Sequence, residues 1–230
     1  MTPDFSTWIP VPSPNMFTGR KDAFPVSGLV MHFTAAGSGK GTAEYFAKEE
    51  VSWTENGQVK TVKVSASAHL VIDRDGTVYQ CVNFADRAWH AGPATLWKGK
   101  PTPTNVNDFT IGIELANWGN LTKDPKGIGL LNYLGKPFNG QAGSFDVGDP
   151  KTFWETYPQA QMNAAIQATK VIISKYPAIL RENVTGHENI QLNKHDPGPA
   201  FPWSEFLNSV YGYDDDELDL LNSDNHEDRS

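Results

Sequence analysis

The sequence has a single cysteine, Cys81, and so lacks the residues from which disulfides and thiolate metal sites are built. One cysteine excludes an intrachain disulfide framework and any zinc site that needs two or more thiolates. No apolar run approaches the ~18 residues of a transmembrane helix, so we expect no membrane insertion. The N-terminus also lacks the basic start and apolar run of a secretory signal. We therefore expect a globular chain synthesised in the cytoplasm.

Positive charge is scarce as well, since 19 Lys and Arg residues stand against 27 Asp and Glu residues. The excess of negative charge is local, because residues 214–230 hold eight acidic residues and one arginine. A nucleic-acid-binding surface needs clustered basic residues, so nucleic acid is excluded as a partner. Dense like charge with few apolar residues predicts a disordered acidic tail over 214–230.

The rest of the chain is long enough to bury a core, and 39% of all residues are hydrophobic. Residues 1–27 are rich in proline and predict an extended N-terminal arm on the domain surface. Residues 28–213 contain no repeat and no low-complexity linker, so we expect them to form one domain.

Strand patterns occur at several places in this domain. Residues 28–33 form a short apolar run, and apolar side chains alternate along residues 109–117. The Asn-Gly pair at 56–57 predicts a hairpin turn, and the Asp-Gly pair at 75–76 predicts another.

Helical spacing follows in the second half. Apolar residues across 162–176 recur three and four apart, and the following proline ends the predicted helix. A last helix is predicted over 202–211, whereas the Gly-, Pro-, Asn- and Asp-rich residues 119–153 predict a long loop. Interleaved strands and helices indicate an α/β or mixed α+β fold with a central mixed β-sheet flanked by helices.

Two histidines and one aspartate form a candidate metal site. His32 ends a predicted strand, His187 follows another, and Asp196 stands nine residues further on. Two imidazoles and a carboxylate are a common zinc ligand set that leaves a fourth position open. The helical HExxH motif is absent. From the residues alone, structural histidines and a turn-forming aspartate remain the alternatives.

Six short motifs follow one another: VMHFTA (30–35), SAHLVIDRDGTVYQ (67–80), DRAWHAG (86–92), NDFTIGIELAN (107–117), TGHENI (185–190) and KHDPGPAFPW (194–203). Any one of them is a weak signal, but the series in this order is specific. It resembles the zinc-dependent N-acetylmuramoyl-L-alanine amidases of the type 2 amidase family, relatives of the peptidoglycan recognition proteins. The resemblance covers about residues 28–206.

The resemblance implies a peptidoglycan recognition protein-like amidase fold, with residues 28–213 as a zinc amidase domain. It implies Zn²⁺ as the cofactor and His32, His187 and Asp196 as its ligands. The third ligand is a cysteine in the recognition-protein branch and an aspartate in the branch that carries DPGP. This chain therefore resembles the Asp-ligand branch.

Two further residues are implied as catalytic. Glu114 corresponds to the acidic residue that acts beside the metal in the Asp branch. Apolar side chains alternate along its strand, which puts Glu114 on the opposite face with the small residues Gly112 and Ala116. Lys194 corresponds to a basic residue that can donate to the developing oxyanion. From the residues alone, a surface carboxylate and a solvated lysine remain the alternatives.

The motif DRAWHAG is implied to supply a wall of the substrate groove. Trp89 offers an aromatic face to a sugar or peptide, and His90 offers a hydrogen bond. Asn107 is a third candidate for substrate binding. The alternatives are a core tryptophan, a structural histidine and an asparagine that starts a turn.

The implied reaction is hydrolysis of the amide between the lactyl group of N-acetylmuramic acid and L-alanine of the peptidoglycan stem peptide. Two insertions relative to compact recycling enzymes, 49–63 and 119–153, can rim a groove for a polymer, or they can close it. We therefore expect a cell-wall-degrading enzyme of the lysin or autolysin type, released to the wall by another route.

Several alternatives stay open at this point. The chain fits a cytoplasmic amidase that recycles muropeptides, or a peptidoglycan-binding module without turnover. A regulator that acts through its acidic tail and a peptidase of other bond specificity are further alternatives. The expected partner is peptidoglycan or a muropeptide, and nothing in the sequence indicates an oligomeric state.

Overall fold

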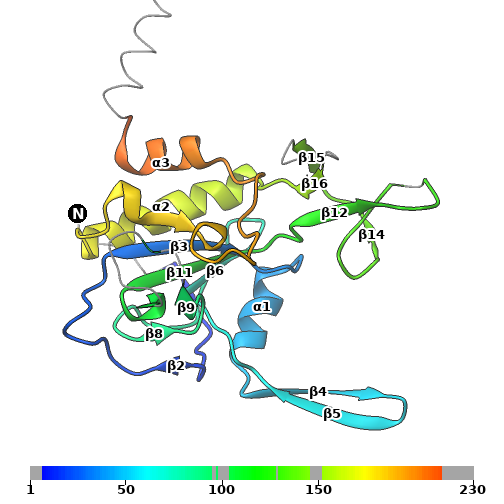
Figure 1. Ribbon diagram of the computed structural model, residues 1–230, viewed down its shortest axis with the longest axis horizontal. Helices are drawn as coiled ribbons and strands as arrows, with labels where there is room; N and C mark the ends of the chain where they lie inside the picture. The colour runs from blue at the N-terminus through cyan, green and yellow to red at the C-terminus, as the bar shows by residue number, and fades with distance from the viewer. Residues whose placement is uncertain (1–6, 95–96, 98–103, 128, 146–151, 214–230) are drawn as a thin grey trace, which may run out of the picture.

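A computed structural model describes residues 7–94, 97, 104–127, 129–145 and 152–213, and it has a mixed α+β fold (Figure 1). The helices are α1 (Gly39–Phe46), α2 (Gln159–Lys175) and α3 (Trp203–Tyr211). The strands are β1 (Ile9–Pro10), β2 (Met16–Phe17), β3 (Gly28–Phe33), β4 (Glu50–Glu55), β5 (Gln58–Lys63), β6 (Leu70–Ile72), β7 (Val78–Gln80), β8 (Arg87–Ala88), β9 (Pro93–Ala94), β10 (Thr104–Asn105), β11 (Thr110–Leu115), β12 (Asn120–Lys123), β13 (Leu130–Leu131), β14 (Pro137–Phe138), β15 (Ala142–Phe145), β16 (Thr152–Glu155) and β17 (Val184–Gly186). Within the described ranges, none of the helices has the length and apolar character of a membrane span. The acidic tail at 214–230 lies outside these ranges.

The central sheet has six strands in the order β1-β7-β6-β11-β3-β17. β6 and β7 form the antiparallel hairpin predicted around the Asp-Gly pair, and the other neighbours are parallel. The sheet is therefore mixed, which confirms the predicted fold class. Helices α2 and α3, both predicted, lie on one side of the sheet, and α1 lies on the other (Figure 1).

Alternation along the central strands separates a core face from a second face. On β11, the buried side chains of Ile111, Ile113 and Leu115 belong to the same core cluster as α2. The intervening residues, Gly112 and Glu114 among them, therefore point to the opposite side of the sheet. We call this opposite side the site face.

The pairing of β3 with β11 sets the geometry of the site face. Glu114 on β11 is the Cα partner of His32 on β3. Partner residues of adjacent parallel strands project to the same side of a sheet, so these two side chains are neighbours. Gly186 at the end of β17 pairs with Met31 on β3, which brings the following residue, His187, to the same region.

The N-terminal arm makes two short strand pairs with the rest of the chain. β1 pairs with β7 in parallel, and β2 pairs with β8 in antiparallel fashion. Beyond β2, the guanidinium of Arg20 donates to the main-chain carbonyls of Phe84, Asn107 and Thr110. The arm thus ties together segments that border the site face. Its division from the domain after residue 27 stays a prediction.

Residues 119–153 differ from the predicted long loop. The described residues from Asn120 to Glu155 form a second sheet of five short strands in the order β14-β13-β12-β16-β15, beside the central sheet (Figure 1). Strands of two to four residues are too short to show clear alternation. Glycines with positive φ, such as Gly127 (75°) and Gly135 (69°), form the turns between these strands. The composition of the segment therefore resembles that of a loop.

The Asn-Gly pair at 56–57 makes the predicted turn of the hairpin β4–β5. Both turn residues have positive φ, at 52° and 77°. Two successive positive φ angles give the turn a twist that matches the right-handed twist of the antiparallel strands it joins. The hairpin extends from the body of the molecule (Figure 1), and its Trp53 is 45% exposed.

Candidate metal centre and active site

Three side chains from distant parts of the chain meet on the site face. His32 lies on β3, His187 follows β17, and Asp196 lies in the segment before α3. Asp196 Oδ2 is 2.8 Å from His32 Nδ1 and 3.1 Å from His187 Nδ1, and the two nitrogens are 3.1 Å apart. The structure therefore brings the three predicted ligands together in a group that can hold a metal ion.

The protonation of this cluster suits a cation. Burial lowers the pKa of His32, so its imidazole is neutral near pH 7 and keeps a lone pair. Burial alone would raise the pKa of Asp196, but the neighbouring imidazoles of His187 and His32 outweigh it and hold that pKa below its ordinary value. Neutral imidazole and ionised carboxylate are the forms in which these side chains bind metals.

A chain of hydrogen bonds fixes which nitrogen of His32 faces the cluster. Thr110 Oγ1 donates to the carbonyl of Val106 at 2.6 Å, so it accepts from His90 Nε2 at 3.1 Å. His90 Nδ1 then accepts from His32 Nε2, also at 3.1 Å. These contacts leave His32 Nδ1 without a proton and directed at the cluster.

Gly112 leaves space for the ring of His90 in this series of hydrogen bonds. Replacing Gly112 is therefore expected to weaken metal binding. A Cβ at Gly112 would lie 2.4 Å from His90 Cγ, so Gly112→Ala must displace His90 and release the hydrogen bond to His32. Changes to groups that orient metal ligands typically cost about 10–100-fold in affinity. We expect a loss of this size in a titration against a competing chelator.

Gly41→Ala in α1 is the matched control for that titration. A Cβ at Gly41 would make only an ordinary contact, 3.5 Å from Ser38 Oγ. The control should bind metal as the unaltered protein does. Equal metal affinity of the two alanine variants would contradict the orienting role of His90.

Glu114 stands beside the cluster in an unusual environment. Its Oε2 atom is buried and has no hydrogen-bond partner within the described residues. Burial, with a smaller contribution from Asp196, raises the pKa of Glu114 to about 8, although the charge of Lys194 opposes this. A carboxyl group with a pKa near the working pH can both take and give a proton.

Lys194 acts on this centre through its charge, whereas Trp89 packs against Phe17 of the N-terminal arm. Lys194 is exposed and lies two residues before Asp196. Its charge lowers the pKa values of Glu114 and His32. Trp89 is half-buried, its ring is 5.4 Å from that of Phe17, and its indole Nε1 is buried without a partner among the described residues.

Asn107 supports a loop in the structure. It is 4% exposed, and its side-chain carbonyl accepts from the main-chain N–H groups of Ala91 and Gly92. His90 likewise uses both ring nitrogens internally, on His32 and Thr110. This geometry favours supporting roles for Asn107 and His90, whereas their contact with substrate stays a prediction.

Sequence reasoning missed several residues around the site. Thr110 completes the hydrogen-bond chain to His32, but a lone threonine in a strand carries no such signal. Arg20 lies in the proline-rich arm, far from every motif. Trp118 and Tyr133 line a cavity that also reaches Glu114. The position of Trp118, directly after the motif at 107–117, was the one hint in the sequence that it lies near the site.

The chain matches the family model Amidase_2, N-acetylmuramoyl-L-alanine amidase, over residues 22–199. It is 35% identical over 144 residues to 1,6-anhydro-N-acetylmuramyl-L-alanine amidase AmpD of Enterobacter cloacae, covering 62% of this chain and 56% of that protein. It is 32% identical over 136 residues to N-acetylmuramoyl-L-alanine amidase AmiD of Escherichia coli, covering 59% and 38%. The chain thus spans about half the length of the first of these curated relatives, and less of the second.

Solved structures agree with these matches. A selenomethionine derivative of AmpD superposes with a TM-score of 0.54 at 28% identity, covering 91% of this chain and 98% of that one. Escherichia coli AmiD, in complex with anhydro-N-acetylmuramic acid-L-Ala-D-γ-Glu-L-Lys, gives 0.57 at 26% identity, covering 87% and 64%. The family model covers well over half of the chain and the fold agrees, so this chain belongs to the Amidase_2 family of N-acetylmuramoyl-L-alanine amidases.

Proposed function

We propose that the protein hydrolyses the amide bond between the lactyl group of N-acetylmuramic acid and L-alanine of the stem peptide. The observation that carries this proposal is the buried Oε2 atom of Glu114, which has no hydrogen-bond partner in the described part of the chain and lies beside His32, His187 and Asp196. Membership of the amidase family supports the same reaction. AmpD and AmiD are named for amidase activity on this kind of bond.

The three-residue cluster fits Zn²⁺. Ligand atoms at about 2.0–2.1 Å in a tetrahedral zinc site lie about 3.3 Å from one another. The observed separations of 2.8–3.1 Å between His32 Nδ1, His187 Nδ1 and Asp196 Oδ2 are close to that value. A zinc ion held there would act as a Lewis acid on the amide carbonyl and on water.

Glu114 moves the proton in the proposed reaction. Its carboxylate takes a proton from the attacking water, and its acid form passes that proton to the nitrogen of L-alanine as the C–N bond breaks. A pKa near 8 keeps both forms within reach at neutral pH. General acid–base catalysis of this kind contributes about 10²–10⁴-fold in rate.

Lys194 and Trp89 are proposed to act on the substrate. The ammonium group of Lys194 is close enough to affect Glu114, and it can donate to the oxyanion that forms on the carbonyl carbon. The ring of Trp89 is partly exposed, so it can contact the sugar or lactyl part.

The relatives favour the recycling alternative over the wall-degrading role that we expected from the insertions. AmpD is named for 1,6-anhydro-N-acetylmuramyl-L-alanine, and AmiD is solved with a soluble anhydromuramyl tripeptide. We therefore propose soluble 1,6-anhydromuropeptides as the substrate class of this chain. A cytoplasmic or wall location stays a prediction.

Product analysis by mass spectrometry tests this function. The zinc-loaded protein should release stem peptides from soluble anhydromuropeptides much faster than from intact sacculi, and a chelator should stop the release. Faster release from sacculi would instead support the wall-degrading role. Binding without release from either substrate would favour the peptidoglycan-binding module and contradict the proposed role of Glu114.

A further inference from the structure

A cavity of about 800 Å³ is lined by Glu114 and by none of the three residues of the metal cluster. Among the described residues with proposed roles, Glu114 alone lines it. The remaining walls include Thr42 and Tyr45 of α1, Gly37, Trp118 and Tyr133. A space of this size accommodates a ligand of several residues, well beyond the reacting amide.

A second cavity of about 440 Å³ continues on the other side of the same aromatic residues. Trp118 and Tyr133 line both cavities, and their ring centroids are 5.9 Å apart. Tyr133 is 62% exposed and lies in the turn between β13 and β14. Trp118 and Tyr133 therefore border both hollows, and we call them the aromatic pair.

The proposed proton transfer by Glu114 determines which part of the substrate enters the first cavity. Glu114 must reach the nitrogen that leaves, because it gives that nitrogen its proton. In this amide the leaving nitrogen belongs to L-alanine, so the stem peptide extends from the nitrogen and the sugar extends from the carbonyl. The cavity that opens at Glu114 thus lies on the peptide side of the bond.

We infer that the aromatic pair, Trp118 and Tyr133, is a recognition surface for the stem peptide beyond L-alanine. This inference rests on the proposed function. Large aromatic rings offer apolar contact to the methylene groups of a short peptide at little cost in side-chain freedom. Tyr133 lies in the turn between β13 and β14 of the second sheet, so this turn sets how much of the peptide is recognised.

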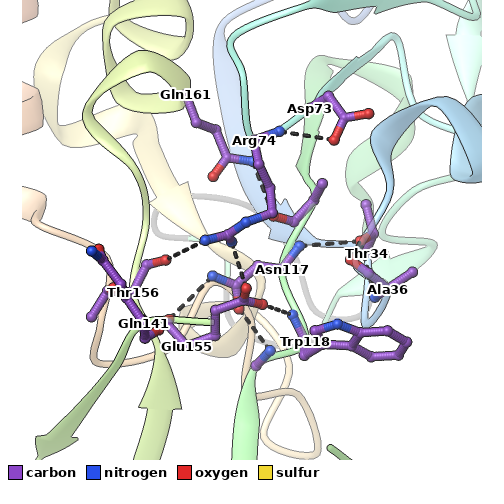
Figure 2. Close-up of polar contacts among 12 residues, drawn as sticks. Thr34, Ala36, Asp73, Arg74, Asn117, Trp118, Gln141, Glu155, Thr156 and Gln161 are labelled. Carbon is purple, nitrogen blue, oxygen red and sulfur yellow. Dashed lines mark hydrogen bonds and ion pairs between the residues drawn. The ribbon is translucent and has the colours of Figure 1, made fainter. Parts of the chain in front are cut away.

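A buried ion pair holds Trp118 in place (Figure 2). Glu155 is 3% exposed, its Oε2 accepts from the main-chain N–H of Trp118 at 2.6 Å, and its Oε1 lies 2.7 Å from Arg74 Nη1. Asn117 donates to the carbonyl of Glu155 and accepts from the N–H of Gly119. Trp118 is thus fixed at the junction of the two sheets.

The indole ring of Trp118 also packs closely against the main chain at Gly37. A Cβ at Gly37 would lie 2.7 Å from Trp118 Nε1, so the segment after β3 approaches the ring closely. A ring that is held before the ligand arrives loses little freedom on binding, which favours recognition. Glu155 is therefore a positioning residue that acts through Trp118.

Two substrates that differ only in peptide length test the aromatic pair. Trp118→Ala should raise KM about 10-fold for an anhydromuramyl-L-Ala-D-γ-Glu-L-Lys substrate and leave KM for anhydromuramyl-L-Ala nearly unchanged. Tyr133→Ala, at an exposed position, should act in the same direction without disturbing the fold. Trp53→Ala in the exposed hairpin is the matched control and should change neither value.

Equal effects of Trp118→Ala and Tyr133→Ala on both substrates would overturn the inference, since they would indicate contact with the sugar or a general disturbance. No effect on either substrate would overturn it as well. Glu155→Gln should raise KM for the tripeptide substrate in the unaltered protein but add nothing in Trp118→Ala. An additive effect would contradict its action through Trp118.

Direct binding separates this inference from the proposed function. The free tripeptide L-Ala-D-γ-Glu-L-Lys should bind the zinc-loaded protein in calorimetry, and more weakly to Trp118→Ala and Tyr133→Ala. If the protein cleaved neither substrate but bound the tripeptide through these residues, the function would fail and the recognition surface would stand. Absence of tripeptide binding would overturn the surface.

Discussion

Replacing Glu114 with glutamine should lower kcat by about 10²–10⁴-fold while the metal stays bound. Glutamine keeps the size of the side chain but neither takes nor gives a proton in this role. Because Glu114 lies next to the cluster and is not one of its three residues, metal content should not change. Steady-state kinetics and metal analysis on the same sample measure the two effects.

Glu188→Gln is the matched control for this experiment. Burial also raises the pKa of Glu188, to about 7, so a perturbed carboxyl group alone does not distinguish the two residues. Glu188 accepts a main-chain hydrogen bond from Gly198 and does not line the cavity that opens at Glu114. Its variant should keep most of the activity, and the reverse result would assign the proton transfer to Glu188.

The Glu114 variant should also change how the metal-free protein responds to pH. Burial raises the pKa of Glu114 from its ordinary 4.5 to about 8, so its contribution to folding is full below pH 4.5 and is lost as the pH rises toward 8. Glutamine has no such loss. The difference in free energy of unfolding between Glu114→Gln and the unaltered protein should therefore grow across this window, as urea unfolding can measure.

Removing a ligand is the second change with a large expected effect. His187→Ala should lose the metal and with it the activity, because only two donors of the cluster remain. The loss of affinity should exceed the ~10–100-fold that changes around a ligand cost. Metal content after dialysis and a chelator titration measure it, and Asp196→Ala should behave alike.

The neighbouring histidine supplies the control. His195 is exposed and does not belong to the cluster, although it directly precedes Asp196. His195→Ala should keep its metal. Full metal occupancy in His187→Ala would contradict the ligand assignment, and loss of metal from His195→Ala would place the ion elsewhere.

The parts of the site that could be predicted are those that local pattern encodes. Alternation along 109–117 predicts that Glu114 faces away from the core, and the structure agrees. His32 and His187 stand at strand ends in the motifs, and parallel pairing with β3 brings them together. Such features depend on one strand or one motif at a time.

The remaining parts depend on contacts between distant segments. The orientation of His90 follows from the open space over Gly112 and from Thr110, which both lie in a different motif from His90. The second sheet escaped prediction because its strands are short and the turns between them are rich in glycine. Trp118 gains its place from Glu155, a residue 37 positions later in the chain.

The most direct test of the central claim is hydrolysis of an anhydromuramyl tripeptide in water enriched in heavy oxygen. The zinc-loaded protein should give a muramic acid product that carries one heavy oxygen in its lactyl carboxylate. The peptide product should have a free L-alanine amine and no label. Label in the peptide alone, or cleavage that continues unchanged after zinc is removed, would contradict the account.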